Sequence, residues 1–419
     1  MHQQKNFMTI WTMWLLASFF YAYQYVLRVL PNIMMVDIFE KFHIDANIFG
    51  QYSGFYYIGY AGMHIPVGIL LDKYGPKKIL PFCMLLATIG LAPLLFCDHW
   101  IYPSIGRILI GMGSSAAILG VFKIIRMAFS EEKFTLMLGF SVTIGLIGAI
   151  YGGQPVNYLF HTFGSDAVIK IVIGIGILLA MATFWIIPKQ TETHSDKSWW
   201  ASVKEVFTHP QVIVICLLAG CMVGPLEGFA DVWGKEYLKS VYKLSENAAA
   251  SLPSLIFLGM CIGSPILSWF VAKTKAYFAT IIVSAFVMGV AFLLLLSGQL
   301  PTQTLSILFI TVGIFCAYQI LALHLTSTYV SERLVGLTTA CANMIIMIFG
   351  YVFHSLIGKI MTVQWSGEMQ NGIPIYNAAD YTQGLMVIPV GLIMAGLGYI
   401  WMVMAKKPKK AMVQKSSGV

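Results

Sequence analysis

Several ionisable side chains lie inside apolar stretches of this chain. The stretch FFYAYQYVLRVLP, residues 19–31, holds Arg28 among three tyrosines and one glutamine. In a helix, Tyr21, Tyr25 and Arg28 share one face because their spacing is i, i+4 and i+7. Gln24 lies four residues before Arg28 and therefore close to that face. A guanidinium binds a carboxylate through two parallel hydrogen bonds. The pattern predicts an anion-binding face walled by tyrosines, which are apolar in body and polar at the tip.

Two carboxylates occupy another apolar stretch, in the C-terminal half. Glu227 and Asp231 are four residues apart on one helix face, and Trp233 follows closely. A charge in lipid is costly unless it faces a cavity or a partner, so these residues are candidates for function. Two neighbouring carboxylates repel each other and favour protonation of one. We predict that both acids contribute to substrate binding and proton coupling, with Trp233 beside the substrate.

A third polar face is expected near residues 56–64. Tyr56, Tyr60 and His64 follow i, i+4 and i+8 spacing, which stacks them along one helix. The two tyrosines extend the predicted substrate-binding wall. His64 is a second candidate for the proton site because histidine titrates close to neutral pH. For each of these rings, simple packing in the helix bundle is the alternative.

The composition indicates which elements carry these residues. Of the 419 residues, 58% are hydrophobic and only 11% are charged, and the mean hydropathy is +0.78. Soluble domains have about 25% charged residues. The chain is therefore predicted to be an integral membrane protein, and its first apolar run is too long for the core of a signal peptide.

Apolar runs separated by loops predict an all-α membrane protein with twelve transmembrane helices. The predicted spans are 9–36, 48–71, 78–97, 102–127, 135–158, 167–187, 211–236, 248–271, 277–298, 303–328, 336–360 and 383–405. They group into two pseudo-symmetric six-helix bundles, residues 1–187 and 211–419, the second ending in a basic tail. A polar cytoplasmic linker, 188–210, joins them and serves either as a hinge that lies on the membrane or as a simple connection.

The two halves echo each other. The segments SEEKFTLMLG (130–139) and SERLVG (331–336) lie 201 residues apart, and the same offset pairs Lys123 with His324. A repeat of six plus six helices is typical of secondary transporters, which bind substrate between the halves. We expect Lys123 and His324 to contribute to an inner gate.

The formal net charge is +8, and its distribution predicts an orientation. Of 26 lysines and arginines, 17 fall on one side of the predicted spans and 6 on the other. The remaining three, Arg28, Arg107 and Lys123, lie further from the ends of their spans. The positive-inside rule then places both termini in the cytoplasm.

The loop between the second and third spans reads GILLDKYGPKK. It contains the G-x-x-x-D-[RK]-x-G-x-[RK]-[RK] signature of the major facilitator superfamily, and the chain resembles that superfamily over essentially its full length. The matching residues are Gly68, Asp72, Lys73, Gly75, Lys77 and Lys78. Pro76 departs from the pattern, because a basic residue is common there.

The resemblance implies that this loop is part of a gate. Gly68 would allow a neighbouring helix to approach closely. Asp72 is expected to pair with Arg126, which Glu131 could share, and to cap the helix at 336–360. In the superfamily such a cluster latches the outward-open state. A purely topogenic basic loop would explain the lysines but not Asp72 with the glycines.

Other segments refine the resemblance. RILIGMG (107–113) is similar to the superfamily's span 4 motif and adds Arg107 to the gating candidates. GAIYGG (148–153) resembles the antiporter motif of span 5, but Ala149 replaces its proline, which favours uptake. The opening FFYAYQYVLRVLPNIM with FYYIGYAGMHIPVG (55–68) resembles the phagosomal nutrient transporters of intracellular bacteria, which implies a bacterial inner membrane.

Depth and fold together suggest how the charges are used. Counted from the starts of their spans, Arg28, Glu227 and Asp231 lie within roughly 6 Å of one another in depth. In the superfamily, spans 1 and 7 both line the central cavity. Arg28 could take a substrate carboxylate while an acid faces its amine, or these residues could form a salt bridge between the halves that closes the outer gate. The two uses are compatible.

The sequence thus predicts a proton-coupled importer of an amino acid or similar small zwitterion. Another solute, such as a nucleoside, an organic anion or a siderophore, moving in either direction, is the alternative. Motifs typical of enzymes and of ATP-driven pumps do not occur. A scaffold without transport activity is the third class. We expect a monomer in the lipid bilayer that binds a small molecule and protons, without nucleic acid, cofactor or metal.

Overall fold

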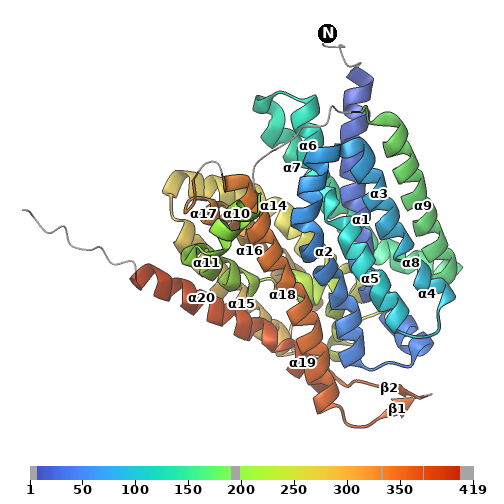
Figure 1. Ribbon diagram of the computed structural model, residues 1–419. Helices are drawn as coiled ribbons and strands as arrows, with labels where there is room; N and C mark the ends of the chain where they lie inside the picture. Colours follow the sequence, from blue (N-terminus) through green and yellow to red (C-terminus); the bar gives the residue numbers. More distant parts are fainter. Residues whose placement is uncertain (1–6, 190–198, 332–333, 371, 406–419) are drawn as a thin grey trace, which may run out of the picture.

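The computed structural model describes residues 7–189, 199–331, 334–370 and 372–405. The first half of the chain forms one bundle of roughly parallel and antiparallel helices (Figure 1). Several predicted spans consist of two helices in line. The helices of this bundle are α1 (Phe7–Phe42), α2 (Ala46–Tyr74), α3 (Pro76–Ile89), α4 (Ala92–Phe96), α5 (Ile101–Ser114), α6 (Ala116–Ala128), α7 (Glu131–Gly152), α8 (Gln154–Phe163) and α9 (Ser165–Ile186).

The second half forms another bundle, and a two-stranded antiparallel hairpin, β1 (Met369–Gln370) and β2 (Ile373–Pro374), lies before its last helices. One segment of this bundle, η1, is a π-helix. The helical segments are α10 (Trp199–Phe207), α11 (Pro210–Gly220), η1 (Gly224–Trp233), α12 (Gly234–Tyr242), α13 (Glu246–Ser251), α14 (Ser254–Thr274), α15 (Tyr277–Leu296), α16 (Thr302–Cys316), α17 (Tyr318–Ser327), α18 (Val335–Gln364), α19 (Ala378–Leu385) and α20 (Val387–Ala405).

Each predicted span is helical in the structure, although some spans consist of two consecutive helices rather than one. Within the described part of the chain, ten helical stretches are long and apolar enough to cross a membrane. The long helices α1 and α2 are not among these ten, and they carry Arg28 and the polar face at 56–64. The total of twelve spans and the cytoplasmic position of the termini remain predictions.

Glycine and proline set the ends and the close contacts of α2. Gly75 follows α2 with φ 77°, a conformation that glycine adopts without strain, and Pro76 then starts α3. Gly111 of α5 lies against the same helix, because a Cβ atom there would be 1.9 Å from the Tyr56 carbonyl oxygen. This contact brings the α5 backbone, and with it Arg107, next to α2.

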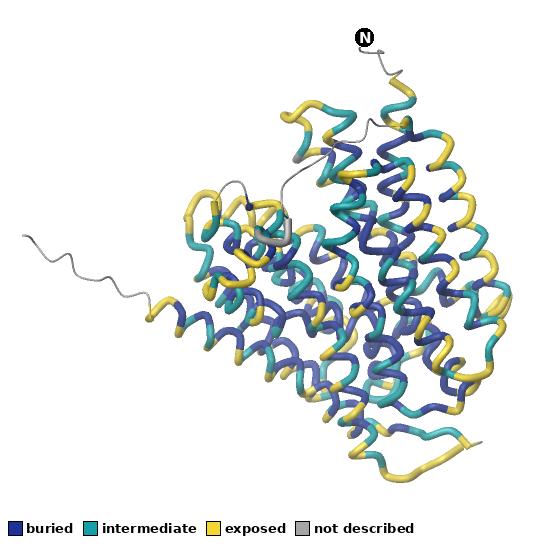
Figure 2. The backbone as a smooth tube through the Cα atoms, in the orientation of Figure 1, coloured by how far each residue is buried: buried dark blue, intermediate teal, exposed yellow. Residues whose placement is uncertain are grey.

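The two bundles meet along α2 and α18. Added Cβ atoms at Gly50 and Gly350 would collide with the His354 carbonyl and the Tyr57 ring, at 2.3 and 2.7 Å. Buried residues run through the centres of both bundles (Figure 2). In Figure 1 the two bundles converge at the end where β1 and β2 lie, and they diverge toward the opposite end, where the N-terminus lies. We call these the N-terminal end and the hairpin end.

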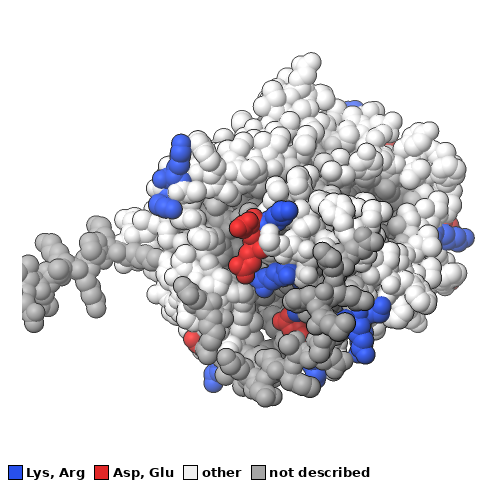
Figure 3. Space-filling view, turned by 90° about the horizontal axis from the view of Figure 1, so that it is seen from above, with Lys and Arg blue, Asp and Glu red and all other residues white. Residues whose placement is uncertain are grey.

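Figure 3 looks onto the N-terminal end, where much of the surface is uncharged and a group of acidic and basic side chains lies near the middle. The predicted linker contributes α10 to the second bundle. Val203 and Val206 of α10 are buried, and Val206 packs in a cluster with Val212 and Cys341. Residues 190–198 of the linker lie outside the described part of the chain.

Candidate functional site

Three buried, charged side chains join the two halves near the middle of α1. Arg28 Nε lies 2.5 Å from Asp231 Oδ2, and Arg28 Nη2 forms an ion pair with Glu227 Oε2. Arg28 is 6% exposed, Glu227 1% and Asp231 0%. The spacing in sequence brought these three residues to a common depth, and the structure brings them into contact. We call them the ion triad.

Tyr57 contacts all three members of the ion triad, although the sequence did not single it out. Its hydroxyl oxygen lies 2.5 Å from Glu227 Oε2 and 2.5 Å from Asp231 Oδ2. The Arg28 guanidinium carbon is 5.7 Å from the centre of the Tyr57 ring. Tyr57 follows Tyr56 directly, so the spacing i, i+4, i+8 that selected Tyr56, Tyr60 and His64 passed over the residue that faces the second half.

The π-helix η1 presents both acids to Arg28. Segments of this type are rare and are frequent at functional sites. Glu227 lies in its first turn and Asp231 near its end, and every residue of η1 is buried. The carboxylates therefore interact with the first half rather than with solvent.

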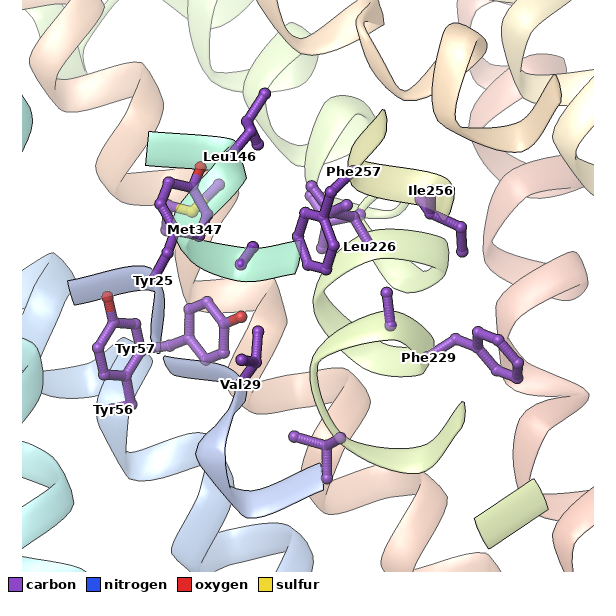
Figure 4. Packing of buried hydrophobic residues seen from close by; sticks show 14 of the residues in the cluster. Tyr25, Val29, Tyr56, Tyr57, Leu146, Leu226, Phe229, Ile256, Phe257 and Met347 are labelled. Atoms are coloured by element: carbon purple, nitrogen blue, oxygen red, sulfur yellow. The ribbon is translucent and has the colours of Figure 1, made fainter. Parts of the chain in front are cut away.

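The predicted tyrosine wall lies on the first half beside the ion triad. The Tyr25 ring centre is 5.0 Å from the guanidinium carbon of Arg28, and the hydroxyls of Tyr21 and Tyr25 are 3.5 Å apart. Figure 4 shows Tyr25, Tyr56 and Tyr57 on one side and Leu226, Phe229 and Phe257 on the other. Tyr25 and Phe257 meet edge to face, with ring centres 6.3 Å apart. The wall thus contacts apolar residues of the second half.

Gln24 and the rings of α2 form a neighbouring row. The Tyr56 hydroxyl donates a hydrogen bond to Gln24 Oε1 at 2.7 Å. Tyr56 stacks on Tyr60 with ring centres 6.0 Å apart, and Tyr60 lies 5.2 Å from the His64 ring. His64 is buried, and its Nδ1 has no hydrogen-bond partner among the described residues. The row begins beside the site and leads away from it along α2.

The structure places Trp233 apart from the ion triad. It is fully buried, and its ring packs on Phe49 of the first half with centres 5.4 Å apart. Two positions along a helix turn a side chain by roughly half a circle, so Trp233 points away from the direction of Asp231. Trp233 is a packing residue between the halves and not part of the wall around the ion triad.

Arg107 is also placed differently from the prediction. It is 2% exposed and lies between α1 and α2, away from the charged loops. Its Nη1 donates to the Leu27 carbonyl at 2.8 Å, and its Nη2 reaches the carbonyls of Arg28 and Ser53 at 3.4 and 3.3 Å. Arg107 therefore contacts the main chain of the site, and its predicted part in gating remains a prediction.

A second ionic cluster, in which Lys235 is buried and Glu246 half-buried, lies on the hairpin side of the ion triad. Lys235, 3% exposed, forms an ion pair with Glu246, and its Nζ donates to Asn157 Oδ1 at 3.0 Å and to the Ile33 carbonyl at 3.3 Å. Asn32 Nδ2 donates to the Ala230 carbonyl at 3.1 Å. We call Lys235, Glu246, Asn157 and Asn32 the hairpin-side seal.

The sequence contained a signal for this seal. Lys235 lies four residues after Asp231 and Asn32 four residues after Arg28, so each continues a face already identified. The positive-inside count instead placed Lys235 at the end of its predicted span, among the six basic residues on the side away from the termini. A lysine at the end of a span and a lysine buried between two bundles look the same in sequence.

Asp72, in the loop that carries the superfamily signature, has a different partner from the one expected. Asp72 Oδ1 accepts a hydrogen bond from Lys123 Nζ at 2.8 Å. Arg126, the predicted partner, is exposed with its guanidinium carbon 5.5 Å from the Phe134 ring centre. On a helix, Lys123 and Arg126 are three residues apart and share a face, so either can reach α2. Glu131 is exposed in the first turn of α7.

The other gating candidates have contacts within their own halves. Among the described residues, an added Cβ at Gly68 would meet only Leu119, at an ordinary 3.8 Å, so Gly68 is not a point of close helix approach here. His324 stacks on Tyr277 with ring centres 4.9 Å apart and is not brought together with Lys123. The proposed cap by Asp72 on α18 remains a prediction, because residues 332–333 before that helix lie outside the described part of the chain.

The loop lysines contact nearby groups. Lys77 Nζ donates to the Ile187 carbonyl at 2.9 Å, and the amines of Lys73 and Lys78 lie 5.1 and 5.9 Å from the Tyr74 ring centre. Within the described ranges, histidine, cysteine and acidic residues form no group of three that could hold a metal ion.

Comparison with solved structures supports the fold. A bacterial homologue of the human lysosomal transporter Spinster, in an inward-facing and unoccupied conformation, aligns with a TM-score of 0.74 and 15% identity over 94% of this chain and 97% of that one. The nucleoside transporter NupG aligns with a TM-score of 0.72 and 15% identity over 94% and 100%. At these identities the similarity concerns the fold alone.

Sequence comparison agrees. The uncharacterized transporter YybO of Bacillus subtilis (strain 168) is 24% identical over 342 residues, which cover 73% of this chain and 76% of that protein. The family model of the Major Facilitator Superfamily matches residues 13–354. The chain is therefore a membrane transport protein and not an enzyme, and it belongs to the major facilitator superfamily.

Proposed function

We propose that this protein imports a small zwitterion, such as an amino acid, together with protons by alternating access. The observation that carries the proposal is the ion triad, which pairs Arg28 of the first half with Glu227 and Asp231 of the second. We place the protein in a bacterial inner membrane as a monomer with both termini in the cytoplasm. In that orientation the hairpin-side seal faces the outside.

A zwitterion can replace the contacts of the ion triad one for one. Its carboxylate would take the place of an acid at Arg28, and its ammonium group would take the place of Arg28 at Glu227 or Asp231. Removing one partner from a buried ion pair leaves an uncompensated charge, which costs about 3–5 kcal/mol. A ligand that carries both charges avoids this cost and allows the halves to separate around it. A purely anionic ligand leaves the acids without their cation.

The contacts of Tyr57 support a proton on the acids. A phenol carries one hydrogen, yet the Tyr57 oxygen lies 2.5 Å from both Glu227 and Asp231. Tyr57 can donate to only one carboxylate at a time. A proton on the other carboxyl group would supply the second hydrogen bond, with Tyr57 as acceptor. Protonation would also weaken the pairing with Arg28, which couples proton binding to the release of the two halves.

The first experiment is a thermal-stability screen of the purified protein against amino acids, dipeptides, nucleosides and carboxylates. A ligand at one hundred times its dissociation constant adds about 2.7 kcal/mol to the free energy of unfolding. We expect hits among zwitterions that vanish in Arg28→Ala. Lys170→Ala, at an exposed position of α9, is the matched control and should keep them.

Uptake into proteoliposomes then tests transport of each hit under an imposed pH gradient. Hits confined to nucleosides or to purely anionic compounds would overturn the amino-acid assignment. A zwitterion that binds Arg28→Ala as tightly as wild type would show that Arg28 does not hold the carboxylate.

A further inference from the structure

Both helices that carry the ion triad are irregular at its level. α1 contains Pro31, three residues after Arg28. η1, which contains Glu227 and Asp231, is a π-helix. In each helix a main-chain carbonyl next to the charged residues binds a polar side chain from another helix of the same half.

In α1 the free carbonyl is a consequence of Pro31. Proline has no N–H, so the carbonyl four residues earlier, that of Leu27, loses its helical donor. Inside a membrane such a group must find a donor from a neighbouring helix, because water does not supply one. Arg107 Nη1 lies 2.8 Å from the Leu27 oxygen and supplies that donor.

The rest of the Arg107 guanidinium extends the connection. Nη2 reaches the carbonyls of Arg28 in α1 and Ser53 in α2, so one planar group joins the two helices that carry Arg28 and Tyr57. The rings of Tyr56 and Tyr52 flank it, with centres 5.1 and 5.9 Å from its carbon. Its described hydrogen bonds all go to main-chain carbonyls.

In the second half His354 of α18 has the corresponding place. Its Nε2 lies 2.5 Å from the Glu227 carbonyl oxygen. A carbonyl only accepts, so Nε2 carries the hydrogen. The same imidazole packs edge-on against the Tyr57 ring, with centres 5.3 Å apart. His354 thus contacts both the main chain of one acid and the tyrosine whose hydroxyl lies beside both acids.

We infer that Arg107 and His354 are positioning residues, which set the place of Arg28 and Glu227 through the main chain without touching substrate. The inference rests on the proposed function only in assigning Arg28 and Glu227 to substrate. Its structural content, that Arg107 compensates for Pro31, is tested without any ligand. A failed ligand screen and a failed positioning test are therefore separate results.

The test for Arg107 is a double-mutant cycle with Pro31→Ala, which restores the missing N–H. In Arg107→Met, hydrogen exchange of the α1 amides near Leu27 should accelerate by about tenfold, as for one lost buried hydrogen bond. Exchange in α15 and α20 should not change. In the Pro31→Ala background the same substitution should have a clearly smaller effect on exchange and on the melting temperature.

Arg107→Lys should recover part of the protection, because one amine can still reach the Leu27 carbonyl but cannot bridge both helices. Additive effects of Arg107→Met and Pro31→Ala, or exchange that accelerates throughout the bundle, would overturn the inference. If Arg107→Met does not fold, recovery of folding in the double variant supports it, and continued failure to fold contradicts it.

For His354 the variants are His354→Gln, which retains a donor, and His354→Phe, which retains the ring. We expect exchange in η1 to stay slow in the Gln variant and to accelerate in the Phe variant. Equal behaviour of the two variants would show that the bond to the Glu227 carbonyl does not hold η1. His99→Phe, in the loop between α4 and α5, is the control and should leave η1 unchanged.

Discussion

The interior carries two positive and two negative side chains at the level of the site: Arg28, Arg107, Glu227 and Asp231. With both acids ionised their formal charges cancel, which suits a region from which water is excluded. A zwitterion entering this site leaves the balance unchanged, whereas a proton alters it by one unit. Buried ion pairs are weak sources of stability. The cluster is therefore better explained by binding and coupling than by folding.

The role of the acids can be separated from that of Arg28 by amide variants. If Glu227 or Asp231 carries the coupled proton, its amide (Glu227→Gln or Asp231→Asn) should still exchange substrate across the membrane but lose accumulation driven by a pH gradient. One pH unit corresponds to 1.36 kcal/mol, or about tenfold accumulation for one proton per substrate. In the variant that lacks the proton site, the substrate should reach equal concentrations on both sides of the membrane.

Accumulation is measured in proteoliposomes with radiolabelled substrate at an imposed gradient of one pH unit. Asp166→Asn, at an exposed position at the start of α9, is the matched control and should accumulate like wild type. Normal accumulation in both amide variants would exclude the two acids as the proton site. His64 would then be the remaining candidate.

At the scale of elements, the continuous segment η1–α12 faces α1 through two successive ionic clusters. The ion triad lies at the level of Arg28, and the hairpin-side seal follows about one helical turn further on, since Asn32 and Lys235 each come four residues later. Opening the hairpin end requires both clusters to separate. The Lys235 amine has four described partners, from α1, α8, α12 and α13, so we expect the seal to act as a local latch.

Lys235→Met should loosen this latch while it keeps the side-chain length. Leaving Asn157 and the Ile33 carbonyl without their donor costs about 1–3 kcal/mol of the closed state. The readout is labelling of a single cysteine at Val29, a position beside the site that is 3% exposed, by a membrane-impermeant maleimide. We expect faster labelling in Lys235→Met.

Lys243→Met is the matched control, because Lys243 is exposed at the end of α12. It should label Val29→Cys at the rate of the parent. Equal labelling in Lys235→Met and Lys243→Met would mean that the seal does not limit access to the site.

At the scale of the whole molecule, alternating access requires the bundles to move relative to each other. The hairpin end offers a place to stop that motion, because the main-chain N–H of Asn47 in α2 donates to Thr362 Oγ1 of α18 at 3.0 Å. A disulfide between Asn47→Cys and Thr362→Cys, in a background without the native cysteines, should abolish uptake. Reduction should restore uptake.

A disulfide within one bundle provides the control. Ser165 of α9 donates to the Asp37 carboxylate of α1, and both residues belong to the first half. Cross-linking Asp37→Cys to Ser165→Cys should leave uptake intact. Transport that continues with the Asn47–Thr362 cross-link in place would contradict a rocking motion of two rigid bundles.

The sequence alone determined the membrane character, the positions of the helices, the superfamily signature and the common depth of Arg28, Glu227 and Asp231. Hydropathy and helical periodicity are local properties, so they can be read without knowing what packs against what. The fixed rise of a helix converts position into depth, which is why charges about 200 residues apart could be matched correctly.

Only the tertiary structure decided which side chains meet. It selected Tyr57 over its neighbours, paired Lys123 rather than Arg126 with Asp72, turned Trp233 into the packing between the halves and buried Lys235. It also placed Arg107 at the carbonyl that Pro31 leaves without a donor. These outcomes depend on how each helix is rotated and how closely it approaches its neighbours. Rotation and approach are set by packing between segments far apart in the chain, which no local pattern contains.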